Sequence, residues 1–319
     1  MGLLVDGKWQ DRWYDTDATG GRFKRQDSAF RDRIGGERFP AEAGRYHLFV
    51  AWACPWAHRT LLFRHLKGLT EAISVSVVAP LMLDHGWEFP DGGDPLTGSR
   101  HLYEVYLKAR PDYTGRVTVP VLWDKHTQSI VNNESAEIVR MLNSGFGDLA
   151  RGPDFYPEDL RVEIDAVNAR VYDDINNGVY KAGFATTQTA YEEAFDALFA
   201  ALDWVEDRLG RQRYLVGDRI TEADWRLFTT LVRFDAVYHG HFKCNLRRIA
   251  DYPHMAGYLR ELYQVPGVAE TVRFDHIKQH YYGSHRTINP TGIVPKGPLL
   301  DLTAPHGRDR FAGIGDIVG

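Results

Sequence analysis

The succession of a strand, a helix and a second strand over residues 46–78 constrains the fold most strongly. Residues 46–52 (YHLFVAW) are apolar except for His47, which is typical of a buried strand, and residues 73–78 (ISVSVV) have the composition of another strand. Between them, apolar residues recur at helical spacing over 56–66. Pro55 precedes this helix, and proline is favoured in a first helical turn because its missing N–H costs nothing there. The pattern therefore predicts a βαβ unit.

The next segments extend this unit into a larger domain. Residues 79–115 form a long polar insertion rich in glycine and proline, in which residues 102–109 predict a short helix. A strand over 117–123, a hairpin turn, a strand over 129–131 and a capped helix follow. A βαβ unit followed by ββα is the order of thioredoxin-like domains, so we expect such a domain over residues 45–145.

The remaining segments have a different character. Helical periodicity dominates from about residue 158, which predicts an all-helical domain over 158–283. Within it, Thr221 and Asp224 predict a reciprocal cap at the start of a helix. Residues 1–44 form a polar N-terminal arm with several aromatic side chains, and 284–319 a C-terminal extension rich in proline and glycine. The predicted fold class is α/β plus all-α.

Composition excludes several classes of protein. Two cysteines among 319 residues cannot build a disulfide framework, and their scarcity is typical of a reducing compartment. A net charge of −5 gives no basic footprint for nucleic acid. The chain has no secretory signal, and no apolar run approaches the about 18–20 residues of a membrane span. We therefore expect a cytoplasmic protein that binds neither nucleic acid nor membrane. The glycine-rich stretches lack any nucleotide-binding motif.

Cys54 is the first candidate for chemistry, because it lies where the first strand passes into the helix. Helix N-termini carry partial positive charge and stabilise a thiolate, which is the nucleophilic form of cysteine. A buried packing cysteine is the alternative interpretation. Ala57 occupies the position where a dithiol motif would have its second cysteine. The thiol that resolves any disulfide at Cys54 must then come from outside the chain.

Two further features have ligand-binding potential. Pro120 lies in the strand predicted over 117–123, and proline at this place in a thioredoxin-like domain is usually preceded by a cis peptide bond. Such a bond would expose the Val119 backbone to a peptide-like ligand. Ser135 and the helix N–H groups after it suit a carboxylate, and Glu134 suits an ammonium group. Taken singly, Pro120 favours an ordinary strand start, and Glu134-Ser135 favours a helix cap.

Together these features resemble the glutathione transferases, with residues 46–142 similar to the glutathione-binding domain and 158–281 to the helical domain. Longer motifs resemble the Xi class, which comprises the glutathionyl-hydroquinone reductases. These motifs are CPWA (Cys54–Ala57), GRVTVPVLWD (Gly115–Asp124), NES (Asn133–Ser135), NNGVYKAGF (Asn176–Phe184), HY (His280–Tyr281) and TINPT (Thr287–Thr291). The resemblance covers nearly the whole chain.

The resemblance implies a role for each matching residue. It makes Cys54 the catalytic nucleophile and places Tyr180 and Tyr281 in the pocket for the hydroquinone. The residues that it assigns to glutathione are Trp87, Arg116, Val119 (through its backbone), Glu134 and Ser135. Glutathione is then a co-substrate, no metal or nucleotide is implied, and a homodimer is expected.

The implied reaction reduces glutathionyl-hydroquinones to hydroquinones. Cys54 takes the glutathionyl sulfur as a mixed disulfide, and a second glutathione resolves it to oxidised glutathione. An omega-like thiol transferase or dehydroascorbate reductase would use the same cysteine chemistry. A transferase-like domain that serves assembly without catalysis is a third possibility, which the intact Cys54, Arg116, Glu134 and Ser135 disfavour.

Other chemically capable residues favour structural interpretations. His58 lies four residues after Cys54 but is expected to be a packing or solvated histidine, and Cys244 lacks any partner motif. His276 and His280 have the spacing of helical metal ligands. The chain lacks the glutamate that follows the first histidine in the corresponding metalloprotease motif, which favours packing.

Overall fold

The computed structural model describes residues 2–311; residue 1 of the predicted arm and residues 312–319 of the predicted extension lie outside the described residues. The described chain forms two compact units. The first contains Arg25–Gly152 and Thr271–Arg286 together with the N-terminal residues up to Trp13. The second contains Tyr14–Lys24, Pro153–Glu270 and the tail from Thr287 onward.

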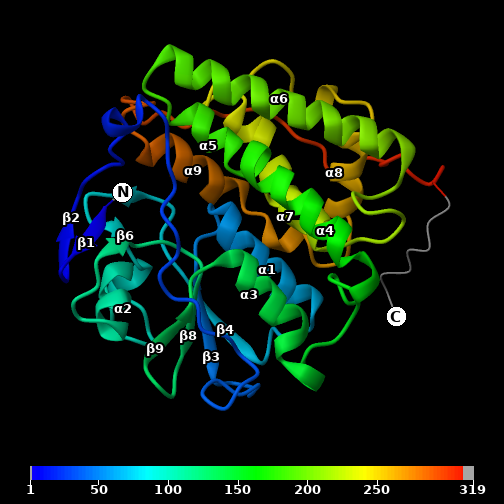
Figure 1. Cartoon of the computed structure of the whole chain (residues 1–319). Coiled ribbons are helices and arrows are strands. Elements are labelled where there is room, and N and C mark those ends of the chain that lie inside the picture. The colour runs from blue at the N-terminus through cyan, green and yellow to red at the C-terminus, as the bar shows by residue number, and fades with distance from the viewer. Residues whose placement is uncertain (1, 312–319) are drawn as a thin grey trace. The chain divides into compact units, whose positions relative to one another are not determined.

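A four-stranded sheet forms the centre of the first unit (Figure 1). Its strands are β3 (Tyr46–Val50), β4 (Ile73–Val77), β8 (Val121–Asp124) and β9 (Ser129–Asn132). Their order is β4-β3-β8-β9, with β3 and β4 parallel and the other neighbours antiparallel. Every residue of β3 is buried, His47 included, as its largely apolar sequence predicts.

Helices cover this sheet and confirm the thioredoxin-like order. The helices of the first unit are α1 (Pro55–Leu66), α2 (Leu102–Ala109), α3 (Ser135–Arg140) and α9 (Phe274–Ser284). In Figure 1, α1 and α3 pack together on one side of the sheet and α2 lies on the other. The bounds of α2 are those that the sequence predicts.

Three short pairings in this unit differ from the sequence interpretation. The arm, expected to be irregular, contains β1 (Leu3–Val5) and β2 (Lys8–Gln10), and β1 pairs with β7 (Gly115–Arg116). The insertion contains a hairpin of β5 (Met82–Leu83) and β6 (Gly86–Trp87). The strand predicted over 117–123 begins only at Val121, because Pro120 has no N–H to donate to a ladder.

The regular secondary structure described in the second unit is helical, as the periodicity predicts. Its α-helices are α4 (Arg161–Arg170), α5 (Gly178–Gly183), α6 (Gln188–Arg211), α7 (Glu222–Arg233) and α8 (Met255–Tyr263). The predicted cap at the start of α7 is present, and the Thr221 N–H donates to Asp224 Oδ2 at 2.7 Å. Among the residues described, no helix combines the length and apolarity that crossing a membrane requires.

The two units group some residues differently from the predicted segments. Residues 271–283, predicted as the end of a helical domain, belong to the first unit, whereas residues 14–24 of the arm belong to the second. In the second unit Arg22 forms an ion pair with Glu193 at 2.7 Å, which ties the arm segment to α6. The domain boundaries 1–44, 45–145, 158–283 and 284–319 stay predictions.

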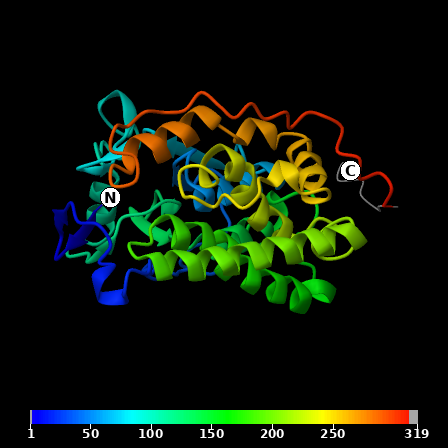
Figure 2. The ribbon, with the colours of Figure 1, turned by 90° about the horizontal axis from the view of Figure 1, so that it is seen from above.

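Over residues 287–311 the tail follows an extended path, drawn orange to red in Figure 2. Arg308 anchors it, because its buried guanidinium donates to main-chain carbonyls around the end of α6. These acceptors include the oxygens of Leu209 at 3.3 Å and Gln212 at 3.0 Å. Its Nε also lies 3.2 Å from the Glu261 carboxylate, so the tail supplies a cation to the carboxyl end of a helix.

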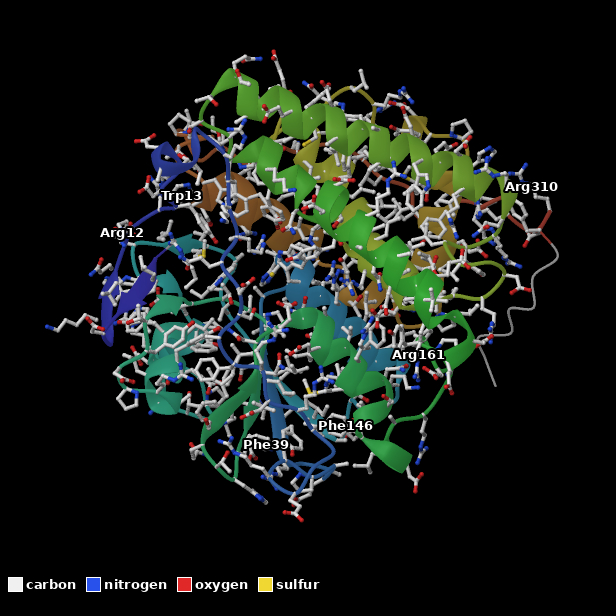
Figure 3. All side chains as sticks on the ribbon, in the orientation of Figure 1. Arg12, Trp13, Phe39, Phe146, Arg161 and Arg310 are labelled. Atoms are coloured by element: carbon white, nitrogen blue, oxygen red, sulfur yellow. The ribbon has the colours of Figure 1, made fainter. Side chains whose placement is uncertain are left out.

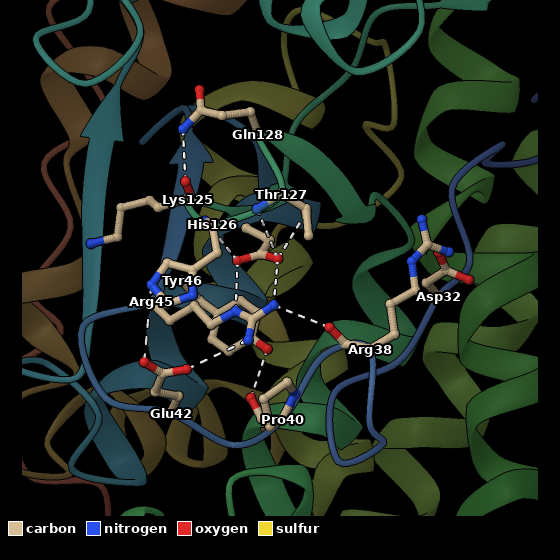
Figure 4. A network of polar contacts seen from close by, with 11 residues as sticks. Asp32, Arg38, Pro40, Glu42, Arg45, Tyr46, Lys125, His126, Thr127 and Gln128 are labelled. Carbon is tan, nitrogen blue, oxygen red and sulfur yellow. Dashed lines mark hydrogen bonds and ion pairs between the residues drawn. The ribbon is translucent and has the colours of Figure 1, made fainter.

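A buried ion pair lies at the end of the first unit's sheet that is remote from Cys54 (Figure 4). Arg45 Nε and Nη2 each donate to the Asp124 carboxylate at 2.8 Å, and Arg45 also donates to the Arg38 carbonyl. Thr127 Oγ1 donates to Asp124 at 2.8 Å in the turn between β8 and β9. Burial by itself would raise the pKa of Asp124, but these hydrogen bonds lower it to about 2.

We predict that Asp124→Asn lowers the free energy of unfolding by about 3–5 kcal/mol, because it leaves the buried Arg45 guanidinium without its counter-charge. Urea unfolding at pH 7 measures the change. The control is Asp159→Asn, which removes an exposed ion pair with Arg219 and should cost less than about 1 kcal/mol. If both variants lost the same free energy of unfolding, the buried pair would stabilise the fold no more than an exposed pair, and the prediction would be wrong.

We also predict acid sensitivity from His47, whose Nδ1 lies 2.7 Å from Ser74 Oγ. Burial lowers the pKa of His47 to about 4, whereas the unfolded chain has a histidine pKa near 6.5. Between these values the unfolded state binds the proton and the folded state does not, so stability falls as the pH falls. The free energy of unfolding should therefore fall between pH 7 and pH 5, and in His47→Gln this fall should be about 2 kcal/mol smaller than in the wild type. Urea unfolding at both pH values tests this, and an unchanged loss would refute it.

Candidate active site

Cys54 lies at the N-terminus of α1, as the sequence predicts. It is the N-cap residue, in extended conformation (φ −77°, ψ 120°), and its carbonyl accepts the first helical hydrogen bond, from the His58 N–H at 2.9 Å. The residue is partly exposed and is not in a disulfide. A thiol here lies beside the N–H groups of the first turn, which favours its thiolate form.

The Val119–Pro120 peptide bond is cis, which confirms the expectation from the sequence. The Cys54 thiol donates to the Val119 carbonyl, with Sγ 3.5 Å from the oxygen. Within residues 2–311, the Val119 N–H donates no hydrogen bond. Backbone groups at this position suit pairing with the main chain of an extended, peptide-like ligand.

Glu134 and Ser135 form the N-terminus of α3. Glu134 is the N-cap residue: its Oε1 accepts from the Ala136 N–H at 3.1 Å, and its Oε2 accepts from Ser28 Oγ at 3.1 Å. Ser135 is buried, and Arg59 on α1 donates to its Oγ at 3.5 Å. Arg59 thus links α1 to the N-terminus of α3.

Ser28 and Arg59 were not singled out from the sequence. Arg59 lies on the same helix as Cys54, and its guanidinium is 4.6 Å from the centre of the Trp56 ring. The only indication in the sequence that Arg59 belongs to the site is its position five residues after Cys54 on the same predicted helix. Ser28 lies in the arm, where no local pattern marks it as a neighbour of Glu134.

Trp87 and Arg116 are each held by a second segment of the first unit. The Trp87 ring stacks on His280 from α9, with 4.7 Å between ring centres, and His280 Nδ1 donates to the Pro80 carbonyl at 3.0 Å. Arg116 donates to the carbonyls of Arg12 at 2.6 Å and Trp13 at 3.0 Å. His280 is therefore a packing residue here, and the described residues include no cluster of three or more metal-ligating side chains.

The two predicted pocket tyrosines belong to different units. Tyr281 is buried in the first unit, edge-on to His280 and His285. Tyr180 is buried in the second unit in an aromatic cluster that includes Phe23, Phe184, Tyr238 and Phe242. All the other predicted site residues lie in the first unit.

Cys244 and His58 have structural surroundings. Cys244 is fully buried, and this burial raises the pKa of its thiol far above the usual range. His58 is also fully buried, and its Nε2 lies 2.8 Å from Thr271 Oγ1. The two cysteines thus differ sharply in their environment.

The chain is similar to known proteins over nearly its whole length. The family described as "Glutathione S-transferase, N-terminal domain" matches residues 53–144, and "Glutathione S-transferase, C-terminal domain" matches residues 188–261. Glutathionyl-hydroquinone reductase YqjG of Escherichia coli (strain K12) is 57% identical over 98% of this chain and 100% of its own. Glutathionyl-hydroquinone reductase PcpF of Sphingobium chlorophenolicum is 58% identical over 95% and 98%.

Solved structures agree with these matches. The glutathione-bound structure of YqjG superposes with a TM-score of 0.90 and 53% identity, covering 97% of this chain and 100% of the other. A Xi class glutathione transferase from Natrialba magadii superposes with a TM-score of 0.91 and 50% identity, covering 98% of both chains.

We predict that a thiol-alkylating reagent modifies the folded protein once, at Cys54, because Cys244 is buried and its raised pKa keeps it protonated. Intact-mass and peptide mass spectrometry after brief iodoacetamide treatment measure this. The unfolded chain, as control, should be modified at both cysteines. Modification of Cys244 in the folded protein would contradict the assignment.

Proposed function

Because the chain belongs to the Xi class of glutathione transferases, the family of the glutathionyl-hydroquinone reductases, we propose that it reduces glutathionyl-hydroquinones to hydroquinones with glutathione. The observation that carries the proposal is the position of Cys54. Its thiol lies at the N-terminus of α1 and 3.5 Å from the carbonyl oxygen beside the cis proline, with alanine at position 57.

Glutathione binds, in this proposal, along the backbone beside Cys54. The Val119 N–H and carbonyl pair with the main chain of the glutathione cysteinyl residue. The Glu134 carboxylate receives the γ-glutamyl ammonium, and Ser135 with the first N–H groups of α3 receives its carboxylate. Trp87 and Arg116 contact the rest of the tripeptide.

The reaction then proceeds by two exchanges at sulfur. The Cys54 thiolate attacks the sulfur of the glutathionyl group, so that an S–S bond forms and the bond from sulfur to the aromatic ring breaks. The ring carbon keeps the electron pair and takes a proton, which gives the hydroquinone. A second glutathione thiolate attacks the mixed disulfide, releasing oxidised glutathione and the Cys54 thiolate. Cys54 is regenerated unchanged, so the two electrons that the ring gains come from the second glutathione, which ends in oxidised glutathione.

Tyr281 supports the ring in this proposal. Its phenol can donate to a hydroquinone oxygen and so stabilise charge that develops as the sulfur departs. The corresponding role of Tyr180 stays a prediction, as does the homodimer. We place the reaction in a reducing cytoplasmic compartment, since it consumes glutathione and neither cysteine is in a disulfide.

We predict that Cys54→Ala lowers kcat for a glutathionyl-hydroquinone at least about a thousandfold, because no other group can form the mixed disulfide. Chromatographic detection of the released hydroquinone measures the rate. Cys244→Ala is the matched control and should keep the wild-type rate. Undiminished turnover by Cys54→Ala would contradict the mechanism.

The same preparations distinguish the alternative activity. An omega-like thiol transferase would reduce dehydroascorbate faster than a glutathionyl-hydroquinone, whereas the proposed enzyme should favour the latter. After treatment with oxidised glutathione, mass spectrometry should find a glutathione adduct on Cys54 alone.

A further inference from the structure

The N-terminal arm docks on the segment that carries Arg116. Strand β1 pairs with β7, with Leu3 opposite Arg116 and Leu4 opposite Gly115. The turn between β1 and β2 is held as well, because the Asp6 N–H donates to Thr114 Oγ1 at 2.9 Å. Main-chain pairing therefore fixes the arm against β7, and the Thr114 side chain adds a further hydrogen bond.

The arm then turns back onto the Arg116 side chain. Arg12 and Trp13 lie just after β2 (Figure 3), and their carbonyls accept hydrogen bonds from the two terminal guanidinium nitrogens of Arg116. A guanidinium is planar, so two such bonds fix the orientation of its plane. The arm thus sets the direction in which Arg116 presents its donors.

Trp9 of β2 holds the hairpin that carries Trp87. Its indole Nε1 donates to the Asp84 carbonyl in the hairpin turn at 2.9 Å, and its ring stacks on Tyr103 of α2, with 4.9 Å between ring centres. The ring also contacts Gly86, where an added Cβ would lie 2.7 Å from it. Gly86 has a φ of +71°, so both the backbone and the contact require glycine.

We propose that the arm over residues 3–13 is part of the glutathione site, with Trp9 as a positioning residue for Trp87 and the carbonyls of Arg12 and Trp13 as positioning groups for Arg116. The inference rests on the proposed function, because it takes Trp87 and Arg116 as contacts of glutathione. Trp9 acts through the hairpin and has no part in the sulfur chemistry. Its loss should weaken glutathione binding and leave the rate of the bound complex unchanged.

Trp9→Ala tests this proposal in the full-length protein. We expect the Kd of glutathione, measured by titration calorimetry, to rise about tenfold, because a small misplacement of binding groups is costly. The kcat for a glutathionyl-hydroquinone at saturating glutathione should stay within about twofold of wild type. Trp9→Phe keeps the stack on Tyr103 and should restore most of the affinity.

Trp204→Ala is the matched control, since Trp204 is also a partly exposed indole but lies on α6 in the second unit. It should leave the Kd of glutathione unchanged even if it lowers the thermal unfolding temperature. Should Trp9→Ala fail to fold, Trp9→Leu keeps an apolar side chain in the arm but lacks the indole N–H and the aromatic ring, and should give the same rise in Kd.

An unchanged Kd in the folded Trp9 variants, or an equal rise in Trp204→Ala, would overturn the role of the arm. If Trp9→Ala lowered kcat by the same factor as it raised the Kd of glutathione, the positioning role of the arm would also be overturned. A wild-type protein that binds glutathione but leaves glutathionyl-hydroquinones unreduced would instead overturn the proposed reaction, and the comparison of Kd values would still decide the role of Trp9.

Discussion

The antiparallel register of β3 and β8 determines which main-chain atoms lie beside Cys54. Phe49 pairs with Val121 and Tyr46 with Asp124, so the end of β3 that leads to Cys54 meets the end of β8 that follows Val119. The same ladder brings Arg45 and Asp124 together at its other end. A slip of one residue would turn every side chain of β8 to the opposite face of the sheet. The ion pair and the thiol are thus positioned by one set of backbone hydrogen bonds.

Much of this ladder could be predicted because its elements have strong local patterns. The apolar run of β3 and the helical spacing of α1 are legible in a few residues, and they locate Cys54 at the junction. The thioredoxin-like order and the family resemblance then indicated the cis bond before Pro120. These predictions succeed because local sequence and tertiary structure favour the same conformation.

The rest depends on contacts between segments far apart in sequence. Strands β1 and β7 have three and two residues, too few for a hydrophobic period, and their pairing joins positions more than a hundred residues apart. The carbonyls of Arg12 and Trp13 are chemically the same as any others, so no sequence pattern could indicate that they bind Arg116. Likewise, α9 is amphipathic like its neighbours, and it belongs to the first unit, where His280 contacts Trp87 and Pro80, residues about 200 positions earlier.

The anchoring of the tail by Arg308 has a consequence for how the chain folds during synthesis. Helix α6 is 24 residues long, yet the guanidinium that binds its last carbonyls comes from a residue 99 positions after Leu209. Domains generally fold from the N-terminus as they leave the ribosome. The carboxyl end of α6 must wait, solvated by water, until the segment that carries Arg308 has emerged as well. The second unit therefore completes its packing only after a further 99 residues beyond Leu209 have been synthesised.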